Sequence, residues 1–187
     1  MTASSEHHNS EAKETLLAWI ERDRERLISF LSQLVRAASP NPPGDTRAAA
    51  TEVQALLNAE GLDHRVISPH PEMPNLVASF EGHEPGRHLV LNGHIDVFPS
   101  GDPANWTYGP WSGAIAEGSV WGRGSVDMKC GTTASIFNVS LSPSPSRSAE
   151  GPSHPDRRFG RGDFWSLGRA LFDGASSRGA WRLLLER

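Results

Sequence analysis

A histidine and an aspartate two residues apart, His94 and Asp96, stand where an apolar run meets a Gly/Pro-rich loop in "LNGHIDVFPSGDPANW". Residues two apart on a strand point to the same side. Both could therefore face one site at a strand's carboxyl end, where open α/β sheets bind ligands. A histidine nitrogen can bind a metal there while the nearby carboxylate holds the ring. For an isolated His-x-Asp, a histidine that hydrogen-bonds a loop is the commoner alternative.

A second carboxylate, Asp127, follows a glycine-rich turn in "WGRGSVDMKCG" and precedes the expected start of a helix. Gly122 and Gly124 let the backbone turn tightly and approach a ligand closely. A carboxylate has two oxygens and can bridge two divalent ions, as two-metal hydrolases require. This context favours the metal-site interpretation of His94 and Asp96.

Two amphipathic helices are expected to precede the site. Apolar residues at helical period predict a helix from Thr15 to Ala38, which the prolines of "SPNPPG" (39–44) end. Asp45 is the predicted N-cap of a second helix, and Gly61 is its predicted stop. The polar residues 1–14 are expected to form a disordered tail.

Three strand-like runs follow the helices. They are "HRVIS" (64–68), "NLVASF" (75–80) and "HLVLNGHIDV" (88–97), and the last reads as a strand covered on both faces. Helices followed by strands in this order predict an α/β layer fold.

The bulk properties are those of a globular domain rather than a disordered chain. The 187 residues carry a formal net charge of −4, with 37% hydrophobic residues and one cysteine. These values favour neither nucleic acid nor an anionic membrane as a partner, and a single cysteine excludes an internal disulfide. The polar N-terminus has no apolar h-region, and no apolar run approaches the length of a membrane span. We therefore expect a cytoplasmic protein.

"NPPG", followed by "HLVLNGHIDVFPSGDPANWTYGPWSGAIAEGSVWGRGSVDMKCGTTASI", closely resembles the M20 family of zinc-dependent aminopeptidases and deacylases. The resemblance covers about residues 15–140. It implies part of a three-layer zinc-hydrolase catalytic domain with a mainly parallel sheet. It also implies hydrolysis of amide or peptide bonds in small N-acyl amino acids or short peptides.

The resemblance assigns roles to the three site residues. His94 matches a ligand to one zinc, and Asp127 matches the carboxylate that bridges the two ions. Asp96 matches the residue that orients the metal site and assists catalysis. The family's peptide bond between Asp127 and Met128 is often cis. Zinc is the implied metal, and cobalt is a possible substitute because such sites accept several divalent ions.

Other positions match the family's structural residues. Cys130 stands where glycine is common, and packing at a helix start is favoured over a role as a metal ligand. The remaining structural matches are Trp106, Pro110, Gly118, Arg123 and Gly124.

The family's site needs ligands that the motifs do not supply here. Its bridging aspartate is followed by a Glu-Glu pair that provides the general base and a further ligand, and this chain has no adjacent glutamates. After Asp127 the candidates are Glu150, His154 and Glu186, whose spacing and context differ from the family's. The resemblance therefore implies a truncated chain that lacks the lid and dimerisation domain and is inactive by itself. The alternatives are a non-catalytic remnant, a partner of a full-length family member, or an unstable product with no role.

The composition changes after about residue 140. Residues 141–187 are rich in Ser, Pro, Arg and Gly and contain no Lys, Val or Ile. We expect this tail to be poorly ordered and not to resemble the family. One hypothesis is that the reading frame departs from the family near Asn138. Translation of the downstream nucleotides in three frames tests it, and finding no Glu-Glu followed by glycines in any frame would contradict it.

Overall fold

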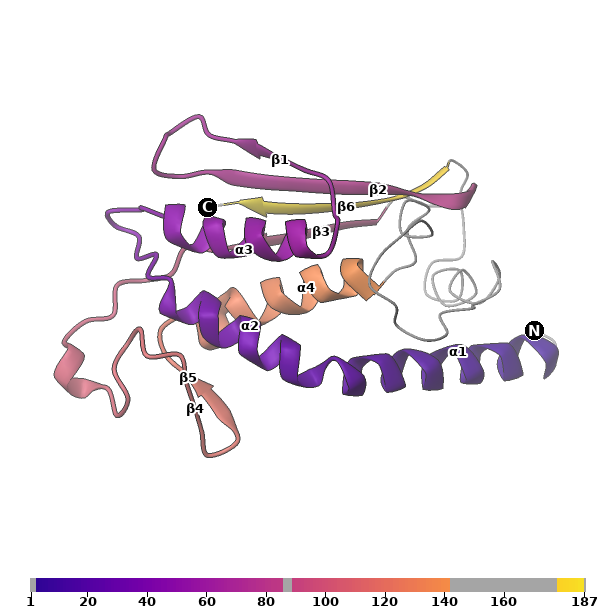
Figure 1. Cartoon of the computed structure of the whole chain (residues 1–187), viewed down its shortest axis with the longest axis horizontal. Helices are drawn as coiled ribbons and strands as arrows, with labels where there is room; N and C mark the ends of the chain where they lie inside the picture. Colours follow the sequence, from indigo (N-terminus) through magenta and orange to yellow (C-terminus); the bar gives the residue numbers. More distant parts are fainter. Residues whose placement is uncertain (1–2, 86–88, 142–177, 187) are drawn as a thin grey trace.

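The computed structural model describes residues 3–85, 89–141 and 178–186. Its helices are α1 (Ala3–Arg22), α2 (Arg24–Arg36), α3 (Arg47–Ala59) and α4 (Cys130–Leu141), with the short turns η1 (Pro103–Asn105) and η2 (Ser125–Lys129). Its strands are β1 (His64–Ile67), β2 (Asn75–Pro85), β3 (Leu89–His94), β4 (Ala114–Ala116), β5 (Ser119–Trp121) and β6 (Arg178–Glu186). In Figure 1, α2, α3 and α4 lie on one side of the larger sheet. The predicted α/β class is confirmed.

The larger sheet has the strand order β1-β2-β6-β3. β2 runs antiparallel to both β1 and β6, and β3 runs parallel to β6. The sheet of the described strands is thus mixed, not mainly parallel as expected. The segment 68–74 between β1 and β2 is too short for the crossover that a parallel pair requires, so these strands pair antiparallel. A separate hairpin joins β4 to β5.

Strand β3 lies at an edge of this sheet and is covered on one face. Leu91 packs against the core, whereas Val90 is 50% exposed. The expectation of a strand covered on both faces was wrong for the described residues, because the helices lie on one side of the sheet.

The predicted helix 15–38 is interrupted at Asp23, which separates α1 from α2. Asp23 is buried, and its carboxylate accepts a hydrogen bond from Arg22 Nη2 at 3.0 Å and pairs with Arg26 Nη1 at 3.5 Å. Backbone bonds from Asp23 to Trp19 and from Leu27 to Asp23 continue the helical pattern, so the interruption is local. α1 begins at Ala3 and includes most of the stretch that was expected to be a disordered tail.

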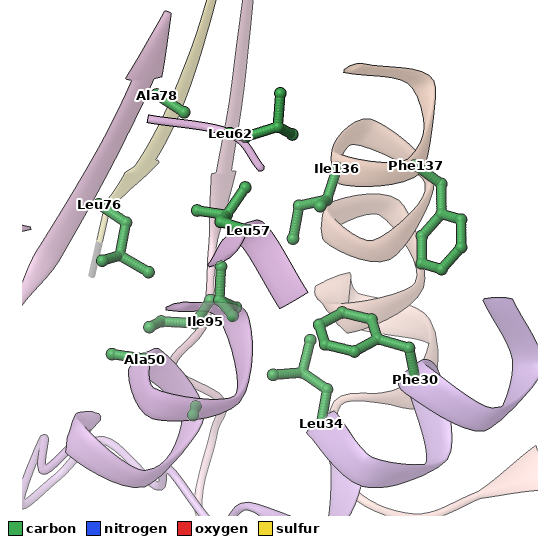
Figure 2. Packing of buried hydrophobic residues seen from close by; sticks show 12 residues of the cluster. Phe30, Leu34, Ala50, Leu57, Leu62, Leu76, Ala78, Ile95, Ile136 and Phe137 are labelled. Atoms are coloured by element: carbon green, nitrogen blue, oxygen red, sulfur yellow. The ribbon is translucent and has the colours of Figure 1, made fainter. Parts of the chain in front are cut away.

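The core fills the space between the helices and the sheet (Figure 2). Phe30 of α2 meets Phe137 of α4 with ring centroids 6.1 Å apart and tilted by 49°. Each such side chain contributes roughly 1.5–3 kcal/mol when it leaves water. The rest of the buried cluster is Leu34, Ala49, Ala50, Val53, Leu57, Leu62, Leu76, Ala78, Ile95 and Ile136.

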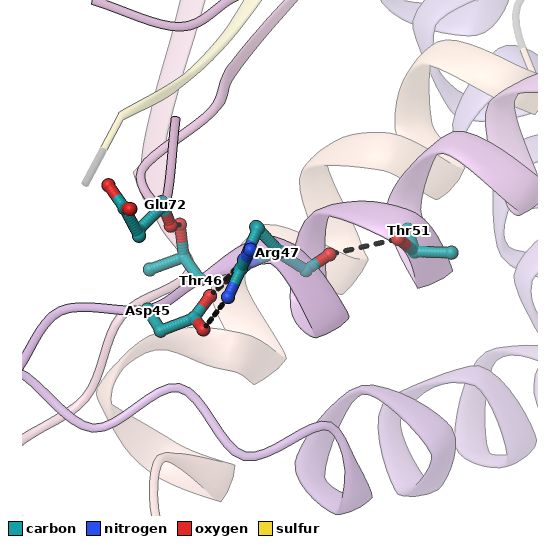
Figure 3. A network of polar contacts seen from close by, with 5 residues as sticks. All are labelled: Asp45, Thr46, Arg47, Thr51 and Glu72. Carbon is teal, nitrogen blue, oxygen red and sulfur yellow. Dashed lines mark hydrogen bonds and ion pairs between the residues drawn. The ribbon is translucent and has the colours of Figure 1, made fainter. Parts of the chain in front are cut away.

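The start of α3 is a polar network (Figure 3). Thr46, not the predicted Asp45, holds the N-cap position, and its amide donates to the Glu72 carbonyl at 2.8 Å. The Asp45 carboxylate instead accepts from the Arg47 amide at 3.1 Å and pairs with the Arg47 guanidinium at 2.6 Å. The N-cap is therefore one residue later than predicted, and the Asp45 carboxylate contacts Arg47, the first residue of α3, instead of capping the helix.

The end of α3 is the predicted one. Gly61 has φ +64°, and the amide of Leu62 donates to the Leu57 carbonyl at 2.8 Å. A residue in the left-handed region closes the helix by satisfying its last carbonyls, as glycine does most easily.

Residues 142–177, which are most of the tail, lie outside the described residues. The expectation that they are poorly ordered therefore stays a prediction. Its last part, 178–186, is strand β6 between β2 and β3. Within the part of the chain that the structure describes, no helix is long and apolar enough to cross a membrane.

Candidate metal site

His94 ends strand β3 and contacts Asp96 directly. Its Nδ1 lies 2.9 Å from the backbone oxygen of Asp96 and 3.2 Å from Asp96 Oδ1. Both neighbours are acceptors, so Nδ1 carries the proton. In the neutral form of the ring the lone pair is then on Nε2, the nitrogen that faces away from Asp96.

Asp127 lies on that other side of the ring. Its Oδ1 is 3.4 Å from His94 Nε2. A lone pair and a carboxylate oxygen repel each other at this distance unless a proton or a cation lies between them. Two ligands held about 2.1 Å from one tetrahedral ion are roughly 3.4 Å apart. The pair therefore fits two ligands of one zinc ion.

The turn that carries Asp127 is anchored to the end of α2. η2 is bent at Asp127 and Met128, and the peptide bond between them is cis, as the sequence resemblance implied. Lys129 is fully buried, and its Nζ donates to the carbonyls of Leu34 and Ala37, each at 2.8 Å. Burial lowers the pKa of Lys129 to about 8.

The two glycines before Asp127 lie directly against buried side chains, a packing role that the sequence did not predict. Gly124 has φ +81°, and a Cβ there would collide with Cγ1 of Val97. A Cβ on Gly122 would collide with Cγ1 of Val35. The glycine turn thus packs directly on the segment that follows β3, which brings Asp127 to His94.

A further bond joins the beginning of α4 to β3. Thr132 Oγ1 donates to the backbone oxygen of His94 at 3.0 Å, and Thr132 is buried. The Cys130 thiol donates to the Val126 carbonyl at 3.0 Å, which is a contact at the helix start, not a contact with the site.

The coordination is incomplete in the described part of the chain. No group of three or more His, Cys, Asp or Glu side chains there could hold a metal ion. Glu150 and His154 lie outside the described residues. Glu186, which sequence context did not connect to the site, is the register partner of His94 across the parallel pair β3 and β6.

Matched structural positions border the site. The Arg123 guanidinium lies 5.1 Å from the centre of the Trp106 ring, a cation–π contact. The amide of Arg123 donates to the Pro110 carbonyl at 2.7 Å. These contacts join the loop after β3 to the glycine turn.

Sequence reasoning missed one polar contact to Asp96. Asn41 Nδ2 donates to Asp96 Oδ2 at 2.9 Å. Asn41 belongs to "NPPG", whose prolines were interpreted as the end of a helix. The available signal was the amide side chain placed directly before two prolines.

Comparison with known proteins places these residues in a family context. Residues 90–141 match the model of peptidase family M20/M25/M40. The chain is 44% identical over 104 residues to a succinyl-diaminopimelate desuccinylase of Paracoccus denitrificans, which covers 55% of this chain and 26% of that protein. It is 33% identical over 127 residues to an N-formyl-4-amino-5-aminomethyl-2-methylpyrimidine deformylase of Halalkalibacterium halodurans, covering 66% of this chain and 30% of that protein.

Solved structures share the fold. The chain aligns with an M20 family metallo-carboxypeptidase from Sulfolobus solfataricus with a TM-score of 0.54 and 18% identity, over 88% of this chain and 30% of that one. It aligns with human carnosine dipeptidase 1 with a TM-score of 0.55 and 16% identity, over 92% of this chain and 34% of that one. The chain thus spans about a quarter to a third of the length of these proteins.

Proposed function

We propose that the chain carries part of a peptidase family M20/M25/M40 domain and that this part supplies some of the metal ligands of an amide hydrolase. The observation that carries the proposal is the 3.4 Å approach of His94 Nε2 and Asp127 Oδ1, with the proton held on Nδ1 by Asp96. His94 and Asp127 are the proposed ligands, and Asp96 is the proposed orienting and catalytic carboxylate.

The chemistry of the family suggests what the completed site does. A divalent ion, zinc or cobalt, held in part by His94 and Asp127 would supply Lewis-acid activation of a water and of the scissile amide carbonyl. This chain's own part is to direct Nε2 of His94 toward Asp127, to offer the Asp127 carboxylate as a second ligand and to hold the Asp96 carboxylate beside the ring. The proposed substrates are small N-acyl amino acids or short peptides, since relatives are named for removing succinyl and formyl groups.

Catalysis requires more than these residues. A catalytic zinc normally has three protein ligands and a water, and a general base contributes roughly 10²–10⁴-fold. The described residues supply two ligands. We therefore propose weak metal binding and no turnover for the 187-residue chain by itself. The alternative function is a non-catalytic remnant, or a partner of a full-length family member.

The complete domain is proposed to have a third layer over the exposed face of the larger sheet. Ile67 and Val90 are 44% and 50% exposed. A further helical layer on the face opposite α3 and α4 would cover such side chains.

Metal content of the purified protein tests the proposal. We expect zinc, titrated by calorimetry into metal-free protein, to bind the wild type and to bind His94→Ala and Asp127→Asn at least tenfold more weakly. His70→Ala and Asp63→Asn change exposed residues of the same types and serve as matched controls. Equal zinc binding by all five proteins, or none by the wild type, rejects the site.

Turnover and partner capture separate the two functions. Zinc-loaded wild type is assayed with N-succinyl and N-formyl amino acids. Turnover that His94→Ala abolishes would show that the chain is an enzyme by itself and overturn the expectation of inactivity. Co-purification of an intact family member, together with restored turnover, would support the partner alternative.

A further inference from the structure

The segment before α3 is fixed to the chain that follows β3 by main-chain contacts. The amide of Asn41 donates to the Val97 carbonyl at 2.8 Å, and the amide of Val97 donates to the Ser39 carbonyl at 3.0 Å. The buried hydroxyl of Ser39 donates to the Ile95 carbonyl at 2.6 Å. These bonds place the backbone of Asn41 beside the His94–Asp96 segment whatever side chain residue 41 carries.

The side chain of Asn41 adds a bond of a different kind. Its Nδ2 donates to Asp96 Oδ2 at 2.9 Å, while the other carboxylate oxygen, Oδ1, lies 3.2 Å from His94 Nδ1. A carboxylate is only an acceptor, so the amide nitrogen of Asn41 must face it. The amide is neutral at every pH, so it orients Asp96 without neutralising its charge.

Asp96 has little freedom left once both oxygens are engaged. Rotation of the carboxylate would break the Asn41 bond and move Oδ1 away from the ring. Without Oδ1, Nδ1 of His94 retains the backbone oxygen of Asp96 at 2.9 Å as an acceptor. The backbone oxygen of Asp96 already favours a proton on Nδ1 of His94. The Asp96 carboxylate, oriented by Asn41, strengthens that preference.

We propose that Asn41 is a positioning residue for the metal site. Through Asp96 it holds the His94 proton on Nδ1 and so keeps Nε2 free toward Asp127. The order of contacts is Asn41 to Asp96, Asp96 to His94, and His94 to Asp127. Only the consequence for metal binding rests on the proposed function; the effect on the histidine tautomer does not.

The first test is the tautomer of His94 in the metal-free protein. Nitrogen-15 NMR at pH 8 distinguishes protonated from unprotonated ring nitrogens, and the His94 signals are those lost in His94→Gln. We expect the wild type to carry the proton on Nδ1 and Asn41→Leu to show a shift toward the Nε2–H form. Asn75→Leu, which removes the bond from Asn75 Nδ2 to the Ile67 carbonyl, is the matched control and should leave the tautomer unchanged.

A double variant shows whether Asn41 acts through Asp96. In an Asp96→Ala background, Asn41→Leu should change neither the tautomer nor the zinc affinity further. In the wild-type background, Asn41→Leu should weaken zinc binding by about tenfold, the usual effect of losing an outer-shell partner.

The outcomes distinguish this proposal from the proposed function. An unchanged His94 tautomer in a folded Asn41→Leu protein overturns the positioning role, and so does an equal effect in both backgrounds. If the wild type binds no zinc but Asn41→Leu still shifts the tautomer, the metal function fails and the positioning role stands. If Asn41→Leu does not fold, Asn41→Ser, which is smaller and keeps a polar side chain, is measured in the same way. An unchanged tautomer in that variant then counts against the proposal.

Discussion

The ammonium of Lys129 lies 2.8 Å from the backbone oxygen of Leu34, completely buried, two residues after Asp127. It also donates to the Ala37 carbonyl at 2.8 Å. The last carbonyls of a helix have no partner within the helix, and a cation near them is favourable. Lys129 therefore couples the end of α2 to the turn that carries the proposed bridging carboxylate.

Alkaline pH is expected to stabilise the fold through Lys129. Burial lowers its pKa to about 8 from 10.5, so between these values the unfolded chain binds more protons than the folded chain. The free energy of unfolding should then rise as pH increases from about 8 to 10.5, by on the order of 3 kcal/mol at most. Urea unfolding of the wild type and of Lys129→Met at several pH values measures this difference.

Comparison with Lys129→Met isolates the effect of Lys129, because few other groups titrate in this pH range. The chain has only two lysines, Lys13 and Lys129, one tyrosine and one cysteine. Lys13, the tyrosine and the cysteine remain in Lys129→Met, so their contributions cancel in the comparison. Parallel pH profiles of the two proteins would contradict the prediction.

Gly124→Ala should destabilise the protein by about 2–4 kcal/mol. The backbone strain of a positive φ costs roughly 1–2 kcal/mol, and overpacking against Val97 adds roughly 1–3 kcal/mol. Gly118→Ala isolates the strain, since Gly118 has φ +71° but no atom within 4 Å of an added Cβ. Chemical denaturation should show a larger loss for Gly124→Ala. Equal losses would exclude the close approach to Val97.

The core prediction compares two leucines of neighbouring helices. Leu34→Ala should cost about 2–5 kcal/mol because Leu34 is fully buried. Leu17→Ala should change stability by about 0.5 kcal/mol or less because Leu17 is 54% exposed. Thermal and urea unfolding provide the comparison, and a loss at Leu17 as large as that at Leu34 would show that α1 is packed differently.

Zinc should stabilise the fold against unfolding if His94 and Asp127 bind it. At a free zinc concentration 100 times the Kd, the gain is about 2.7 kcal/mol. A chelator should remove this gain from the wild type and have a clearly smaller effect on His94→Ala, which binds zinc more weakly. A similar chelator effect on both proteins would place the zinc elsewhere.

Sequence alone determined the elements and the types of residue at the site. Apolar runs, helical period and turn residues predicted α3, β1 and β3 within about three residues, whereas β2 extends five residues beyond the predicted strand. The motifs around His94 and Asp127 predicted that these two residues belong together. Such features are readable because they depend on neighbours along the chain, such as Gly61 at the end of α3.

Tertiary contacts decided the remaining features. The interruption at Asp23 accompanies its burial beside Arg22 and Arg26, and the mixed sheet depends on β6 entering between β2 and β3. The bond from Asn41 to Asp96 joins residues 55 positions apart, and the bond from Lys129 to Leu34 joins residues 95 apart. Local sequence patterns cannot predict contacts between residues so far apart in the chain. Sequence therefore identified which side chains could bind a metal, and only the folded chain decided which nitrogen of His94 faces Asp127.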